Sequence, residues 1–205
     1  MFKQLLVISI FAVALSTAAS RFDYFPGDLV LTNAFQSIRF PFLELLMESV
    51  SYLGDGLIAL LFVLLIAGIF LLQNLRIESI VIFSSLIAAG LNYIVKLAVD
   101  RPRPVDDLVI VAHQTDTASF PSGHVVYSFV LFGLLYCLAP RLVSGKWGIW
   151  AIRLVSILMA VLIGLSRIYL GVHWPSDVIG GLVFGFIYLM IALAFYRRYR
   201  VRHIQ

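Results

Sequence analysis

The feature that most constrains this chain is a series of long apolar runs that carry few or no charged residues. A helix needs about 20 residues to cross the hydrocarbon core of a bilayer, and several of these runs approach that length. The chain is 61% hydrophobic and 13% charged, whereas a soluble domain carries about 25% charged residues. These observations predict an integral membrane protein.

The apolar runs predict six membrane-spanning helices in one all-α domain over residues 1–205. The predicted spans are residues 5–19, 57–72, 80–99, 121–138, 149–165 and 178–195. The first run has a competing interpretation, because Lys3, a short apolar stretch and the small residues 16–19 are also typical of a cleavable signal peptide. We favour retention, since the downstream apolar segments would otherwise lack a packing partner.

The stretch between the first two spans, residues 22–53, has a different pattern. Large apolar residues alternate there with Asp, Asn, Gln, Arg and Glu, and Pro41 divides the stretch in two. This pattern predicts two short amphipathic helices that lie along the membrane surface.

The distribution of charge predicts the orientation. In a six-span arrangement, nine of the fifteen Lys and Arg residues fall on one side; they are Lys3, Arg76, Arg141, Lys146, Arg153, Arg197, Arg198, Arg200 and Arg202. The positive-inside rule makes this side cytoplasmic. We therefore expect a multi-pass protein of the cell membrane with both termini in the cytoplasm. The net charge of +4 is accounted for by orientation, and we expect no nucleic-acid partner.

Cys137 is the single cysteine, so an intrachain disulfide and a thiolate metal cage are excluded. The loop before residue 121 carries three aspartates and His113. We expect this loop to be solvated rather than to bind a metal. Three aromatic residues near span ends, Trp147, Tyr169 and Trp174, are expected at the membrane interface.

Three polar clusters lie at the ends of predicted spans. They read K-x6-R-P at residues 96–104, P-S-G-H at residues 121–124 and S-R-x5-H-x3-D at residues 166–177. In the six-span arrangement all three reach the same, extracytoplasmic face. Ionisable residues are costly inside a membrane protein, so their concentration at one face indicates a functional site.

The cations of these clusters are suited to an anion. Lys96, Arg103 and Arg167 supply donors for the oxygens of a phosphoryl group. Taken singly, each could instead extend to the membrane interface from a helix end. Arg101 also precedes a proline, and we expect it to contact solvent or lipid headgroups.

The P-S-G-H cluster predicts a helix start, with Pro121 in its first turn. Free N–H groups at such a start bind anions, and Gly123 lets the backbone approach an oxyanion closely. A simple helix start with a polar histidine would give the same pattern.

His173 and Asp177 are four residues apart, with Pro175 between them. If Pro175 opens the last span, Asp177 can accept a hydrogen bond from the imidazole and fix its tautomer. The other ring nitrogen would then be free to attack phosphorus. The alternative is that Asp177 only caps the helix and His173 lies exposed in a loop.

Together the clusters closely resemble the type 2 phosphatidic acid phosphatase (PAP2) superfamily, also called the lipid phosphate phosphatases. Every defining position is filled, namely Lys96, Arg103, Pro104, Pro121, Ser122, Gly123, His124, Ser166, Arg167, His173 and Asp177. The motif region covers residues 96–177, and the six-span layout extends the likeness to most of the chain.

The resemblance implies a transmembrane helical bundle that hydrolyses lipid phosphates without a metal or cofactor. It implies that His173 attacks phosphorus to form a phosphohistidine, that Asp177 orients it, and that His124 protonates the leaving group. It assigns the phosphoryl oxygens to Lys96, Arg103, Ser122, Gly123 and Arg167, with Pro104, Pro121 and Ser166 in support.

Other members of the superfamily leave alternatives. Soluble vanadium haloperoxidases are disfavoured by the apolar spans, whereas a lipid phosphotransferase would need the same residues. A non-catalytic membrane binding protein would predict lesions among the motif residues, and none is found.

Four candidate substrates carry a phosphate on an apolar tail: undecaprenyl pyrophosphate, phosphatidylglycerophosphate, phosphatidic acid and a lipid A phosphate. The small chain favours a bacterial envelope lipid, with the isoprenoid pyrophosphate as first candidate.

Overall fold

The computed structural model describes residues 2–202, and every regular element in that part of the chain is a helix. The helices are α1 (Phe2–Ala19), α2 (Pro26–Gln36), α3 (Pro41–Tyr52), α4 (Gly56–Leu72), α5 (Arg76–Ile82), α6 (Ser84–Val99), α7 (Gly123–Leu142), α8 (Lys146–Tyr169) and α9 (Pro175–Arg202).

Four segments are long and apolar enough to cross a membrane: residues 76–99 (α5 with α6), α7, α8 and α9. The pair α3 and α4 is bent by 68° and makes a fifth if it is one broken span. The first predicted span corresponds to α1, which is a shorter apolar helix. Each of the six predicted spans is therefore helical, and four or five meet the length and hydropathy of a crossing.

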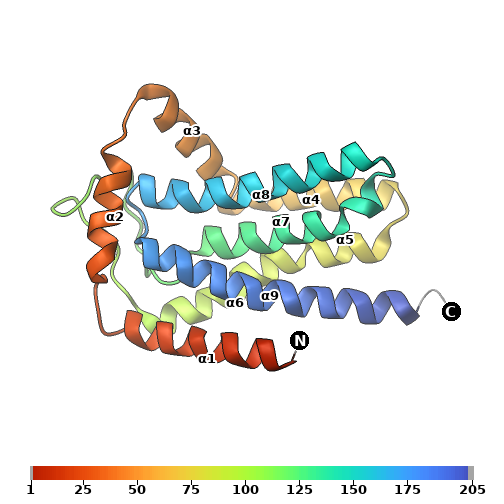
Figure 1. Cartoon of the computed structure of the whole chain (residues 1–205), viewed down its shortest axis with the longest axis horizontal. Helices are drawn as coiled ribbons and strands as arrows, with labels where there is room; N and C mark the ends of the chain where they lie inside the picture. Colours follow the sequence, from red (N-terminus) through yellow and green to blue (C-terminus); the bar gives the residue numbers. More distant parts are fainter. Residues whose placement is uncertain (1, 203–205) are drawn as a thin grey trace.

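The long helices run side by side, and α7 lies among them (Figure 1). Leu131 and Leu134 of α7 are fully buried, and they belong to the same hydrophobic core cluster as Val63 and Phe70 of α4. On the α9 side, a Cβ on Gly181 would lie 2.8 Å from Val125 Cβ. The glycine therefore allows α7 and α9 to pack closely together.

Helix α2 lies across one end of this bundle (Figure 1). It buries Asp28, Thr32 and Gln36. The Gln36 amide donates to the carbonyls of Ile110 and Tyr169, 2.7 and 2.9 Å away. The two short helices predicted between the first spans are therefore present as α2 and α3, and α2 uses polar side chains to hold the bundle end together.

Helix α9 runs away from α2 to the opposite end of the bundle (Figure 1). At that end Glu78 accepts from Arg141 Nε at 3.1 Å and from the Tyr196 hydroxyl at 2.7 Å. These bonds join α5, α7 and α9. The side chain of Arg202, the last residue of the predicted basic tail, lies outside the described part.

Candidate active site

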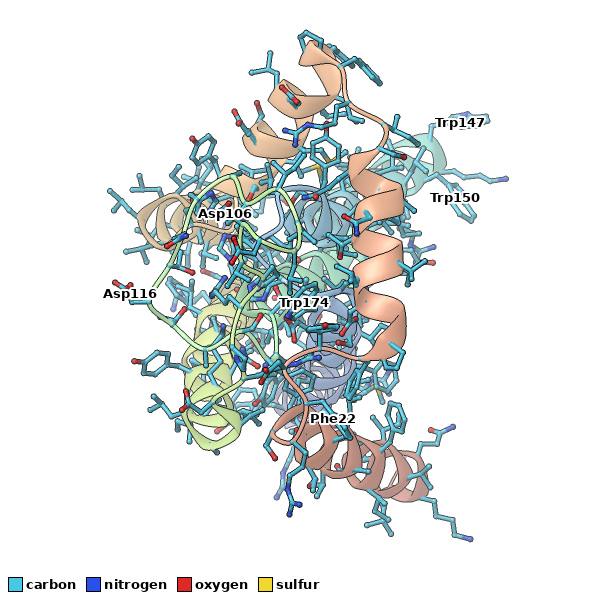
Figure 2. All side chains as sticks on the ribbon, turned by 90° about the vertical axis from the view of Figure 1, so that its left-hand side faces the viewer. Phe22, Asp106, Asp116, Trp147, Trp150 and Trp174 are labelled. Atoms are coloured by element: carbon cyan, nitrogen blue, oxygen red, sulfur yellow. The ribbon has the colours of Figure 1, made fainter. Side chains whose placement is uncertain are left out.

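The site forms at the bundle end crossed by α2, where three connections meet. They are the α3–α4 turn, the long α6–α7 loop at residues 100–122 and the short α8–α9 loop at residues 170–174. Figure 2 faces this end: the loop that carries Asp106 and Asp116 arches over it, and Trp174 lies near its centre. Both aspartates are exposed, as expected of a solvated loop.

His173 lies in the α8–α9 loop and is 1% exposed. Its Nε2 atom is 3.4 Å from Arg103 Nη1. Burial lowers the pKa of His173 well below its usual value, and the nearby charges of Arg103, Lys96 and Arg167 lower it further. The imidazole is therefore held neutral, which is the form that can act as a nucleophile.

Asp177 and His173 are linked through a third residue, Ser119. The direct separation from His173 Nδ1 to Asp177 Oδ2 is 3.6 Å, too long for a hydrogen bond. Ser119 Oγ donates to Asp177 Oδ2 and lies 3.3 Å from His173 Nδ1. Since the serine proton goes to the carboxylate, its oxygen can accept from Nδ1–H. The predicted pairing is thus mediated by a hydroxyl that the sequence did not single out.

The structure contradicts the expectation that Arg101 contacts solvent or headgroups. Its side chain is 1% exposed and ion-pairs with Asp177 at 2.6 Å and with Asp28 at 3.0 Å. Ser176 Oγ and the carbonyl of Phe22 accept from the same guanidinium at 2.7 and 3.1 Å. Two carboxylates offset the cost of burying this cation, and neither is near it in sequence.

The predicted phosphate-binding residues lie at the end of α6, in the α6–α7 loop, at the start of α7 and near the end of α8. Lys96 Nζ donates to the carbonyl of Ala118. Arg103 Nη1 donates to the carbonyl of Val172 at 2.7 Å, and burial lowers the Arg103 pKa from its usual value. Ser122 Oγ and Arg167 Nε are buried and have no partner among the described residues. These donors are available to an anion at this position.

The start of α7 differs from the prediction in one detail. The helix begins at Gly123 with Ser122 as its N-cap, so Pro121 precedes the first turn instead of occupying it. The Ser122 side chain makes no capping bond. By contrast, Pro175 is the first residue of α9, as predicted.

The end of α3 and the α3–α4 turn contribute contacts that sequence reasoning missed. Asp55 Oδ1 lies 2.8 Å from His124 Nε2. The Ser51 hydroxyl accepts a hydrogen bond from Arg167 Nη1. The one local signal for this turn was Gly54-Asp55-Gly56, an acidic residue between two glycines at the edge of an apolar run.

The remaining residues singled out from the sequence are Pro104, Ser166 and the three aromatic residues expected at the membrane interface. Pro104 is buried, and Ser166 Oγ donates to the carbonyl of Ile163 at 2.8 Å, within its own helix. Two of the three expected interfacial aromatics are instead buried: Tyr169 is 3% and Trp174 1% exposed. Trp174 packs near the Tyr24 ring, with 5.2 Å between centroids. Trp147, at the start of α8, is 85% exposed as expected.

Comparison with known proteins assigns the chain to a family. A phosphatidylglycerophosphatase B of Bacillus subtilis is 29% identical over 171 residues, which cover 82% of this chain and 83% of that protein. An undecaprenyl-diphosphatase of Sulfolobus acidocaldarius is 36% identical over 107 residues, covering 51% of this chain and 48% of that protein.

Among solved structures, a transmembrane PAP2-type phosphatidylglycerolphosphate phosphatase from Bacillus subtilis matches with a TM-score of 0.81 at 25% identity, covering 97% of this chain and 98% of that chain. Residues 78–200 match the model of the PAP2 superfamily. The chain therefore belongs to the PAP2 superfamily.

Proposed function

We propose that this protein hydrolyses a phosphate or pyrophosphate carried by a membrane lipid, with His173 as the nucleophile. The observation that carries the proposal is the surroundings of His173. Its Nδ1 atom faces Ser119, and its Nε2 atom lies 3.4 Å from the Arg103 guanidinium. A phosphoryl group beside Arg103 would thus meet the free nitrogen of a neutral imidazole.

The reaction has two steps. His173 Nε2 forms a bond to phosphorus as the bond to the leaving oxygen breaks, and His124 gives that oxygen a proton. Water then attacks the phosphohistidine and gives a proton to His124, which releases inorganic phosphate and restores both histidines. Lys96, Arg103 and Arg167 stabilise the charge that develops on the phosphoryl oxygens.

The placement of the site supports action on a lipid at the extracytoplasmic surface. The motif residues gather at one bundle end. At the other end, Arg76 and Lys146 begin helices and Arg141 lies in the last turn of α7. The positive-inside rule places that second end in the cytoplasm. We propose that α1 and α4 also cross the membrane, which gives six spans with both termini in the cytoplasm.

Two lipids lead the list of substrates. Phosphatidylglycerophosphate is first, because the relative and the solved structure that cover most of the chain carry that activity in their names. Undecaprenyl pyrophosphate is second, because the 36% identical relative is an undecaprenyl-diphosphatase. The first choice differs from the one favoured by chain size alone.

The test is phosphate release by the purified protein in detergent micelles from phosphatidylglycerophosphate, undecaprenyl pyrophosphate, phosphatidic acid and a lipid A phosphate. We expect release from at least one of these, highest with phosphatidylglycerophosphate, and none above background with His173→Ala. Absence of release from all four lipids, or full release by His173→Ala, would overturn the proposal.

A further inference from the structure

The general acid assigned above has a carboxylate partner outside all three sequence motifs. Asp55 Oδ1 is 2.8 Å from His124 Nε2, although the two residues are 69 positions apart. The His124 side chain is 19% exposed and that of Asp55 44% exposed. Asp55 therefore connects a mostly buried imidazole to the surface of the bundle end.

Helix capping does not explain the aspartate. Asp55 is the N-cap residue of α4, a position where aspartate is favoured because its side chain can accept from free N–H groups of the first turn. Here its side chain makes no capping hydrogen bond. The carboxylate is directed to His124, and that hydrogen bond is the main cause that lowers the pKa of Asp55. The carboxylate is thus held ionised.

The turn itself is shaped around the histidine ring. A Cβ atom on Gly54 would lie 2.3 Å from His124 Cδ2, so only glycine allows this approach. Three residues earlier, Ser51 accepts a hydrogen bond from Arg167. The α3–α4 turn is therefore fixed at the site by two separate contacts, and the Asp55–His124 pair follows from that placement.

We propose that Asp55 is the positioning residue that fixes the His124 tautomer and stabilises its protonated form during phosphate transfer. The inference rests on the proposed phosphatase function. His124 Nε2–H donates to Asp55, which leaves Nδ1 to exchange a proton with the reaction. In the first step Nδ1–H gives its proton to the leaving oxygen, and in the second Nδ1 takes one from water. The Asp55 negative charge favours the imidazolium that must be present before the first step and after the second.

Asp55→Asn removes this charge and keeps the shape of the side chain. The effect should depend on the leaving group, because an alkoxide needs a proton and p-nitrophenolate does not. We expect kcat/KM to fall about tenfold or more for a lipid phosphomonoester, since general acids contribute about 10²–10⁴ in rate. For p-nitrophenyl phosphate we expect a loss of less than about threefold. The value of kcat/KM reports only the steps up to P–O cleavage, so a slower hydrolysis of the phosphoenzyme does not change the comparison between the two substrates.

Two variants act as controls. Glu48→Gln removes an exposed negative charge from α3, next to the same turn, and should change neither value. Asp55→Glu keeps the charge and should recover part of the lipid ester activity. Equal losses on both substrates with Asp55→Asn, or no loss on either, would overturn the inference while leaving the phosphatase function intact.

A second measurement does not depend on activity. In protein with isotope-labelled histidine, the pKa of His124 can be followed by NMR in micelles and assigned with His124→Gln. We expect Asp55→Asn to lower that pKa relative to the wild-type protein and Glu48→Gln to leave it unchanged. If the wild-type protein hydrolysed no phosphate ester, the proposed function would fail, and this titration would still decide the Asp55 pair. An unchanged His124 pKa in Asp55→Asn would overturn the proposed role of Asp55.

Discussion

Arg101 Nη1 donates to Asp177 Oδ1 across 2.6 Å in a position closed to solvent. The other oxygen of Asp177 accepts from Ser119 Oγ and from the Trp174 N–H. Asp28, which also pairs with Arg101, accepts from Ser176 Oγ at 2.6 Å. The carboxylate of Asp177, which lies beside the proposed nucleophile, is therefore fixed by a cation, and this cation is tied to the amino-terminal part of the chain.

Arg101→Met should cost both stability and activity. Removing one partner of a buried ion pair costs about 3–5 kcal/mol, because it leaves a buried charge uncompensated. We expect a lower unfolding temperature in detergent and a large fall in kcat as Asp177 loses its fixed position. Arg39→Met is the matched control, since the Arg39–Glu44 pair is exposed and such pairs contribute about 0.2–1 kcal/mol. Equal effects of the two substitutions would contradict the conclusion that Arg101 fixes Asp177 through a buried ion pair.

Ser119→Ala should mainly lower kcat. The substitution removes the hydroxyl that connects His173 Nδ1 to Asp177, so the imidazole loses its orientation while the phosphate donors remain. We expect kcat to fall about tenfold, which is the rate cost of losing about 1.4 kcal/mol, with KM within about twofold. Ser128→Ala provides the comparison, because among the described residues the buried Ser128 hydroxyl bonds only to the Val125 carbonyl of its own helix. A loss in Ser128→Ala as large as in Ser119→Ala would point to a packing effect.

The sequence predicted the helical architecture and the residues that gather at the site, because apolar runs and short motifs are local patterns. It did not predict partners that meet only in the folded chain. Arg101 was placed at the surface because the K-x6-R-P pattern selects Arg103, and no other local feature marks Arg101 as buried. Its carboxylates at Asp28 and Asp177 lie 73 and 76 positions away. Asp55 was missed for the same reason, since a lone aspartate before an apolar helix is equally typical of a cap.

Hydrolysis should continue in excess EDTA. The proposed chemistry assigns the neutralisation of the phosphoryl oxygens to Lys96, Arg103 and Arg167 and not to a metal. Orthovanadate should inhibit, because its trigonal bipyramidal adduct on His173 resembles the in-line transition state. Phosphate release with and without chelator, and against increasing vanadate, checks both expectations. Complete loss with EDTA and recovery with Mg²⁺ would require a different mechanism.

The two histidines should respond differently to substitution. His173→Ala should abolish turnover of every substrate, because it removes the proposed nucleophile. His124→Ala should retain more activity on p-nitrophenyl phosphate than on a lipid ester, since p-nitrophenolate leaves without a proton. The activity of Asp177→Asn should lie between those of the two histidine variants, because the substitution keeps the shape of the side chain and removes its charge. Trapping of a phosphoenzyme in His173→Ala would reassign the nucleophile.

Sidedness can be measured with single cysteines in a Cys137→Ser background. Thr115 lies in the exposed loop over the site, and Ser144 lies in the exposed turn between α7 and α8 at the opposite end. On intact cells a membrane-impermeant thiol reagent should label Thr115→Cys and not Ser144→Cys. After permeabilisation both should react. The reverse pattern on intact cells would place the site in the cytoplasm.

The hydrogen bonds from Asp28 and Gln36 to the bundle end that carries the candidate active site have a consequence for the design of truncated or chimaeric proteins. The stretch that matches the family model starts at residue 78 and contains every motif, yet Asp28, Gln36, Ser51 and Asp55 all precede it. A fragment cut at that boundary would retain the residues by which the family is identified and lose four of the contacts that position them. Chimaeras between relatives should therefore exchange the amino-terminal helices and the motif region together, because the stretch matched by the family model is shorter than the set of helices that hold the site.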